Sequence, residues 1–161
     1  MTSQSQFLTL FAYHFDTTLS LLSHAGKLEV PLLENDPGYG RGSIMGIFTH
    51  LLSADRGWRI GLETARQTRP IDPDQVFDIP LLQSEFEKEA EAFNAFLGNT
   101  DDGLLAADID LTTLRGHTRS FPRWRILQHL LLHGMQHHAE LAQLLTEAGH
   151  SPGDLDFIFY P

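Results

Sequence analysis

The chain of 161 residues carries 11 Lys and Arg against 21 Asp and Glu, and its net charge of −10 argues against a nucleic-acid partner. It contains no cysteine, so disulfides, thiolate metal ligands and a cysteine nucleophile are excluded, and any bound metal must be held by nitrogen or oxygen. The hydrophobic residues, 42% of the chain, occur in runs shorter than the roughly 18 residues of a membrane span.

Neither end of the sequence carries a recognisable targeting signal. The first residues lack the basic segment and cleavage site of a secretory leader, and the last residues lack a lipidation motif. We therefore expect a cytoplasmic protein with no membrane partner. The length suits one hydrophobic core, which predicts a single domain over residues 1–161.

The first two predicted helices cover residues 5–27 and 44–65. In the first, phenylalanine and leucine recur every three or four residues, which is the spacing of one buried helix face, and Gly26 marks its end. The stretch PLLENDPGYGRG that follows is rich in proline, glycine and asparagine and predicts a loop. Ser43 is a suitable N-cap for the second helix.

A third helix is predicted over residues 80–97, followed by a short β-hairpin over residues 105–121. Asp78 suits the N-cap of this helix, and Pro80 lies in its first turn. In the next stretch, AADIDLTTLRGHTRSF, threonine and isoleucine alternate with charged residues around an Arg-Gly pair, which indicates the hairpin.

The last predicted helix covers residues 124–148. Ser120 and Pro122 suit its start, and Gly149 ends it. Four long helices of matched length predict an all-α protein folded as an antiparallel four-helix bundle, with the hairpin before the last helix. The apolar tail SPGDLDFIFYP is expected to pack on this bundle.

Histidines are concentrated in the segment LQHLLLHGMQHHAELAQLL of the last helix. His133 and His137 are four residues apart, so on a helix their rings can converge on one divalent ion. A third ligand has to come from another helix, and His50 is the best candidate because its neighbours Ile47 and Leu51 are expected to point inward. The residues alone leave open the alternative that His50 is a core histidine bonded to a carbonyl oxygen.

The remaining histidines are not expected to be ligands. His129 is too far along the helix to share an ion with His137, so it should lie beside the ligands or in the core, and His138 should point at a neighbour or at water. The others are expected to be ordinary surface or boundary residues: His14, His24, His117 and His150.

Other functional patterns are absent or weak. The Glu-x-x-His pairs of di-iron bundles, a His-Glu-x-x-His motif, a Gly-x-Ser-x-Gly elbow and a phosphate-binding glycine loop do not occur. Basic residues between positions 56 and 69 and between positions 115 and 125 are expected to be solvated surface. Four residues could line the mouth of a site, but their spacing does not distinguish them from ordinary bundle residues: Tyr13, Asp55, Trp58 and Arg125.

Three segments together resemble the DinB family, also called the DinB/YfiT-like metalloenzymes. They are SIMGIFTHLLSADRGW, HLLLHGMQHHAELAQLLTEAGH preceded by SFPRW, and the ending DLDFIFY. The resemblance covers nearly the whole chain in order. It implies an up-down-down-up bundle, a homodimer and a divalent metal held by His50, His133 and His137. The family commonly reads His-x-x-His-His-Arg-Gly-Gln on the last helix, and this chain departs from that pattern at Gln136, His138, Ala139 and Glu140.

The resemblance also implies, for some members, transfer of a low-molecular-weight thiol onto a small electrophile. Three neutral imidazoles suit Zn²⁺ or Ni²⁺, with Fe²⁺ or Mn²⁺ as alternatives, and an ion that keeps its full charge would lower the pKa of a bound thiol. We therefore expect a metal-dependent thiol S-transferase. The alternatives are a metal-dependent hydrolase using the same histidines and a non-catalytic dimeric bundle with adventitious metal. The sequence assigns no catalytic acid or base.

Overall fold

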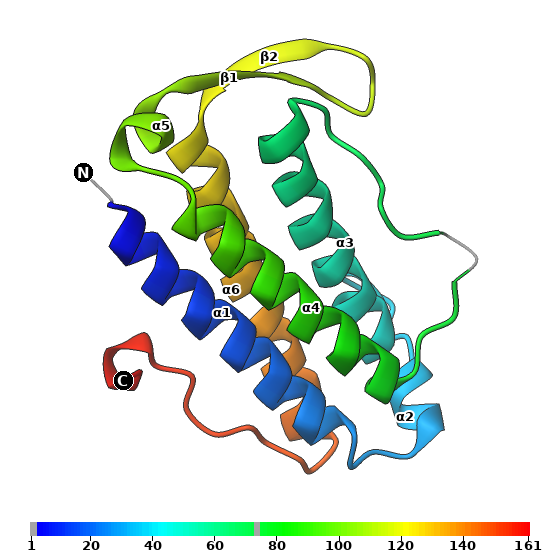
Figure 1. Cartoon of the computed structure of the whole chain (residues 1–161). Helices are drawn as coiled ribbons and strands as arrows, with labels where there is room; N and C mark the ends of the chain where they lie inside the picture. Colours follow the sequence, from blue (N-terminus) through cyan, green and yellow to red (C-terminus); the bar gives the residue numbers. More distant parts are fainter. Residues whose placement is uncertain (1–2, 73–74) are drawn as a thin grey trace.

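The computed structural model describes residues 3–72 and 75–161 and has the expected helical bundle. Its long helices are α1 (Gln4–Ala25), α3 (Ile44–Thr64), α4 (Ile79–Gly98) and α6 (Arg123–Glu147). Figure 1 shows that α1 and α6 run in one direction and that α3 and α4 run in the other, which is the up-down-down-up arrangement. Helix α1 packs against α4 and α6, and α3 packs against the same two helices.

Three of the four long helices start at a residue whose side chain caps the first turn. The side chains of Ser43 and Asp78 accept hydrogen bonds from backbone N–H groups in the first turns of α3 and α4, as the sequence predicts. The prediction for Ser120 was wrong, because this residue lies in a strand, and α6 begins after Pro122 without a side-chain cap. The fixed φ of Pro122 and the end of the strand ladder define that boundary instead.

The shorter elements are α2 (Val30–Glu34), α5 (Asp102–Ala106), β1 (Asp108–Thr112), β2 (Thr118–Pro122) and the 3-10 turn η1 (Phe157–Phe159). The strands β1 and β2 form the expected antiparallel hairpin before α6. Two boundaries were wrong. Helix α2 overlaps the start of the stretch predicted to be a loop, and α5 extends over the first two residues assigned to the hairpin.

The bundle interior is filled by aromatic and aliphatic side chains from all four long helices. The rings of Phe11 on α1 and Phe93 on α4 stack with centroids 4.6 Å apart. Leu51 on α3 and Leu127 on α6 are completely buried. These side chains leave water on folding and supply the main stabilising term. Among the described helices, none combines the length and the hydropathy of a bilayer span.

One cluster of ion pairs joins α3 to α4 inside the bundle. Arg56 and Arg59 both contact the carboxylate of Glu89, which is 1% exposed, at distances of 3.1 and 2.5 Å. The expectation that these arginines are solvated surface was therefore wrong. The missing signal was Glu89, a carboxylate in the buried stripe of α4, because such a group is retained only with close cationic partners.

The C-terminal tail packs on α1 through tyrosines. The hydroxyl of Tyr13 donates to the carbonyl of Leu155, and the hydroxyl of Tyr160 donates to Asp16 at 2.5 Å. By contrast, Ile158 and Phe159 are 81% and 80% exposed. The tail is therefore held by hydrogen bonds and ring contacts more than by burial of its aliphatic side chains.

Candidate metal centre

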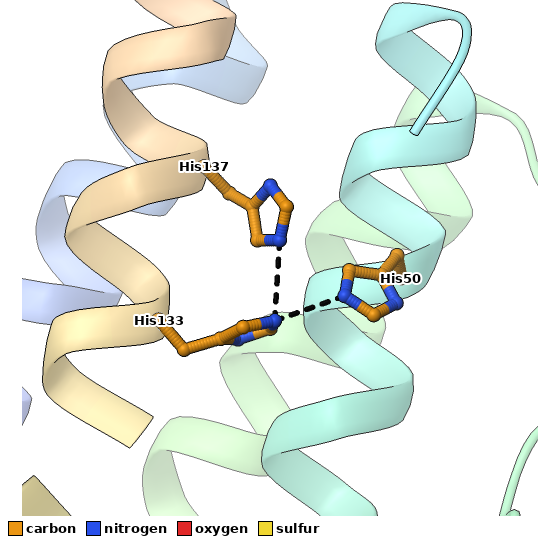
Figure 2. Close-up of side chains that lie close together, drawn as sticks. All are labelled: His50, His133 and His137. Carbon is orange, nitrogen blue, oxygen red and sulfur yellow. Dashed lines mark hydrogen bonds between the residues drawn. The ribbon is translucent and has the colours of Figure 1, made fainter. Parts of the chain in front are cut away.

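The structure brings together the three histidines that the sequence singles out. His50 extends from α3, and His133 and His137 extend from successive turns of α6 (Figure 2). The Nε2 atom of His133 lies 2.9 Å from Nε2 of His50 and 3.1 Å from Nε2 of His137. Three Nε2 atoms therefore face a common centre between two helices that are far apart in sequence.

This geometry fits a divalent ion. An ion with Zn–N bonds of about 2.0–2.1 Å and tetrahedral angles separates its nitrogen ligands by about 3.3 Å, close to the observed spacings. The three rings meet edge to face, with interplanar angles of 70°, 82° and 81°, so each ring directs one nitrogen inward. His137 is buried, whereas His50 and His133 are partly exposed, which leaves an approach from solvent. The three histidines could therefore hold a metal ion.

The environment favours neutral imidazoles. Burial lowers the pKa of His50 to about 4, with a further contribution from the positive charge of Arg41. Burial likewise lowers the pKa of His133 to about 4, and the neighbouring His137 adds to this effect. Both rings are therefore uncharged at neutral pH, and the neutral form is the one that ligates a metal.

Glu140 determines the orientation of the His137 ring. The Nδ1–H of His137 donates to a Glu140 oxygen at 2.7 Å, and the amide of Gln136 donates to the other oxygen at 3.2 Å. Burial raises the pKa of Glu140, but the hydrogen bonds from His137 and Gln136 outweigh it, so the net pKa is lowered and the carboxylate stays charged. With Nδ1 occupied by this bond, the lone pair of His137 Nε2 points at the centre.

A second buried polar cluster is formed by side chains of α1, α3 and α6. The ring of His14 on α1 bonds to Asp55 on α3, with Nε2 and Oδ2 3.0 Å apart, and His138 bonds to Thr18 at 2.8 Å. His14, Thr18, Asp55 and His138 are all at most 2% exposed. The expectation that His14 is a surface or boundary residue was therefore wrong, whereas His138 does point at a neighbour.

The other residues considered from the sequence lie at the edge of the site or away from it. His129 is exposed, so it is not a core residue, and its ring lies between Trp58 (centroids 5.6 Å apart) and His133 (6.0 Å). Trp58 also lines an open cleft of about 940 Å³ together with Arg69, Arg115, Arg119 and Phe121. Tyr13 contacts the tail, and Arg125 is exposed.

Sequence reasoning missed the carboxylates that support the site. Asp55 was grouped with ordinary bundle residues and Glu140 was treated only as a departure from the family pattern. A signal was present for Asp55, since an aspartate in the apolar run IMGIFTHLLSADRGW is expensive to bury without a partner. For Glu140 the signal was its position three residues after His137, which places the two side chains on one helix face.

Comparison with known proteins agrees with this architecture. The model of the DinB family matches residues 1–161. A DinB-like protein from Bacillus cereus ATCC 10987 superposes with a TM-score of 0.76 at 18% identity, over 95% of this chain and 97% of that one. A DinB-like protein from Bacillus subtilis gives 0.70 at 17% identity, over 91% and 94%. No curated protein sequence matches the chain. The match to the family model spans the whole sequence, and the chain belongs to the DinB family.

Proposed function

We propose that this protein is a metal-dependent transferase that joins a low-molecular-weight thiol to a small electrophile. The observation that carries the proposal is the convergence of three imidazole Nε2 atoms, with no carboxylate among the three residues. A nitrogen-only ligand set suits Zn²⁺ or Ni²⁺. Such an ion keeps its double positive charge and, when bound, lowers the pKa of a thiol at an open position.

The residues of the chain hold and orient this centre. His50 and His133 stay neutral at physiological pH, and Glu140 fixes the ring of His137. Because the chain has no cysteine, the sulfur nucleophile must come from the small-molecule thiol. In the transfer, the thiol loses its proton to solvent, and its sulfur forms a bond to the electrophilic carbon. The leaving group departs with the electron pair of its broken bond.

The first experiment measures metal in protein purified without an affinity tag. Elemental analysis of the wild type should find one equivalent of divalent metal, and His50→Ala should lose it while its circular dichroism remains helical. His129→Ala is the matched control, because His129 lies beside His133 but its ring is exposed. Trace metal in the wild type, or equal metal in the His50→Ala variant, would contradict the proposal.

The second experiment tests the reaction. The metal-loaded protein is offered glutathione, bacillithiol or mycothiol with a model electrophile, and conjugate formation should exceed that of the His50→Ala variant. Absence of turnover with all three thiols, together with hydrolysis of an ester substrate, would favour a hydrolase. Absence of both reactions in a protein that holds metal would favour a non-catalytic bundle.

We also propose that the protein acts as a homodimer in the cytoplasm and does not bind nucleic acid or membranes. The support is membership of the DinB family, for which the resemblance implies dimers, and the net charge of −10. Light scattering coupled to gel filtration tests the dimer, and a monomeric mass at micromolar concentration would contradict it.

A further inference from the structure

Asp55 is a buried carboxylate whose hydrogen bonding is incomplete. Its side chain is 0% exposed, and its Oδ2 is bonded to His14 at 3.0 Å. The other oxygen, Oδ1, is buried and has no partner among the described residues. A buried carboxylate without full hydrogen bonding is costly, and the contact with His14 engages only one of its two oxygens. Bundle stability alone gives no reason to keep such a group.

His133 has a buried nitrogen without a hydrogen-bond partner among the described residues, which complements the unpartnered oxygen of Asp55. Its Nε2 faces the candidate metal centre, so in the neutral ring that binds a metal the proton resides on Nδ1. This Nδ1 is buried and also lacks a partner within the described chain. Metal-binding histidines almost always donate their second N–H to a carboxylate, a carbonyl or a water. His137 follows this rule through Glu140, whereas the corresponding acceptor for His133 is missing.

Asp55 is the candidate for that acceptor, because its partner His14 lies against Gly134, the residue that follows His133 on α6. Its negative charge acts on the rings of both His50 and His133, where it partly offsets the larger effect of burial on their pKa. The unpartnered Oδ1 and the unpartnered Nδ1 are one acceptor and one donor in the same interior. A contact between them, direct or through one buried water, would satisfy both groups.

The ring of His14 is closely packed against α6. Gly134 lies between the two ligands of α6, and a Cβ at this position would lie 2.4 Å from the His14 ring. The ring of His14 also stacks on that of His138, with centroids 5.0 Å apart. A glycine inside a helix costs about 1 kcal/mol relative to alanine. The need to leave room for the His14 ring explains why a glycine occupies this position.

We propose that Asp55 is a positioning residue for the metal centre, accepting the His133 Nδ1–H through Oδ1 while His14 holds Oδ2. The proposal rests on the metal-binding part of the function proposed above and does not depend on the reaction catalysed. It assigns a role to the buried layer His14–Asp55, which lies outside the set of three histidines.

The test is the metal affinity of Asp55→Asn. Asparagine keeps the size of the side chain but turns an NH₂ group or a weaker acceptor toward His133, so the Kd for Zn²⁺, measured by competition with a chromophoric chelator, should rise about 10- to 100-fold. The absorption spectrum of the Co²⁺-substituted protein should change as well, because the ring of His133 is no longer held. An unchanged Kd and Co²⁺ spectrum would overturn the proposal.

Glu89→Gln is the matched control. Glu89 is also a buried carboxylate, at 1% exposure, but among the described residues its side-chain hydrogen bonds come from Arg56 and Arg59, between α3 and α4. This substitution should lower the urea midpoint of unfolding and leave the Zn²⁺ Kd and the Co²⁺ spectrum unchanged. A comparable loss of affinity in Glu89→Gln would show that general destabilisation weakens the site and would count against a specific role for Asp55.

A measurement on the wild type keeps the proposal testable if Asp55→Asn does not fold. In Zn²⁺-loaded protein with ¹⁵N-labelled histidine, His133 should show a protected Nδ1–H proton shifted downfield by a carboxylate acceptor. A His133 ring with Nδ1 unprotonated, or with a rapidly exchanging proton, would overturn the proposal. A second variant, His14→Gln, retains a donor to Asp55 and should bind Zn²⁺ more tightly than His14→Leu.

These outcomes separate the inference from the proposed function. If the wild type binds metal but transfers no thiol, only the transferase proposal fails. If Asp55→Asn binds metal like the wild type, only the inference fails. If the wild type binds no divalent metal, both are wrong.

Discussion

Glu140 is the residue whose effect on the candidate centre is most direct. It accepts the Nδ1–H of His137 at 2.7 Å and thereby fixes which nitrogen faces inward. Glu140→Gln retains an acceptor oxygen but removes the charge, so we expect the Kd for Zn²⁺ to rise about 10-fold, the lower end of the range for such supporting groups. Chelator competition measures this change.

The control for that substitution lies on the same helix. Glu147 accepts a hydrogen bond from Gln143 at 3.0 Å. The same type of contact, between residues four apart, joins Gln136 to Glu140 at 3.2 Å. Glu147→Gln should therefore change helix stability to a similar extent without altering the Zn²⁺ Kd. Equal affinities for the two variants would refute the orienting role of Glu140.

Gly134→Ala tests the close approach of His14 to α6. Alanine normally stabilises a helix interior by about 1 kcal/mol relative to glycine. Here the new Cβ would lie 2.4 Å from the His14 ring, and such overpacking costs about 1–3 kcal/mol. We expect a lower free energy of unfolding in urea.

Two further variants test whether the loss of stability comes from the contact with His14. Gly98→Ala, at a position where a Cβ meets nothing within 4 Å, should be neutral or stabilising. Combining Gly134→Ala with His14→Ala should cost less than the sum of the two single changes, because the clash is gone. Strict additivity would show that the ring of His14 is not what position 134 accommodates.

The convergence of His50, His133 and His137 could be predicted from the sequence, whereas the buried polar cluster of His14 and Asp55 could not. The spacing of His133 and His137 specifies one helix face, and the apolar neighbours of His50 specify the inward side of another helix. The burial of His14 depends instead on how α1 is rotated against α6 and on the missing side chain at position 134. His14 and Gly134 are 120 positions apart, so the periodicity within one helix does not predict that they meet.

At the scale of elements, long helices were predictable and short ones were not. The four long helices carry several turns of apolar periodicity, so each is recognised as a helix even when its ends are predicted a few residues away. Helices α2 and α5 have five residues each, too few for a periodic signal or for stability alone. They form because Leu33 and Leu105 are buried and because α2 packs on α3 and α5 on α6.

The C-terminal tail has a pH-dependent attachment to α1. Burial, together with the hydrogen bond to Asp16, raises the pKa of Tyr160 from 10.0 to about 12. The folded state therefore favours the protonated phenol, so the stabilisation from this contact is complete below pH 10 and is lost as the pH rises toward 12.

Ultraviolet titration measures this effect as the difference between the wild type and Tyr160→Phe. The phenolate signal removed by the substitution should have a midpoint near pH 12, and Asp16→Asn should move that midpoint toward 10. A midpoint near 10 in the wild type would show that the hydroxyl of Tyr160 is not held by Asp16 in solution.

At the scale of the whole molecule, the candidate centre joins two helices that are distant in sequence. His50 and His133 are 83 positions apart, and α3 and α6 run in opposite directions. The unfolded chain cannot keep these imidazoles together, so a bound ion stabilises only the native state. At a free concentration of 100 times Kd, one such ion contributes about 2.7 kcal/mol to the free energy of unfolding.

For a chain of this length, that increment corresponds to a rise in Tm of about 5–10 °C. We expect this rise when Zn²⁺ is added to protein stripped with a chelator, and calorimetry at several Zn²⁺ concentrations measures it. His50→Ala should abolish the rise because two ligands from the same helix no longer connect α3 to α6. His129→Ala should retain it, since the exposed ring of His129 lies outside the three converging nitrogens. A rise of equal size in His50→Ala would place the stabilising ion elsewhere on the chain and would remove the structural basis for a metal shared by the two helices.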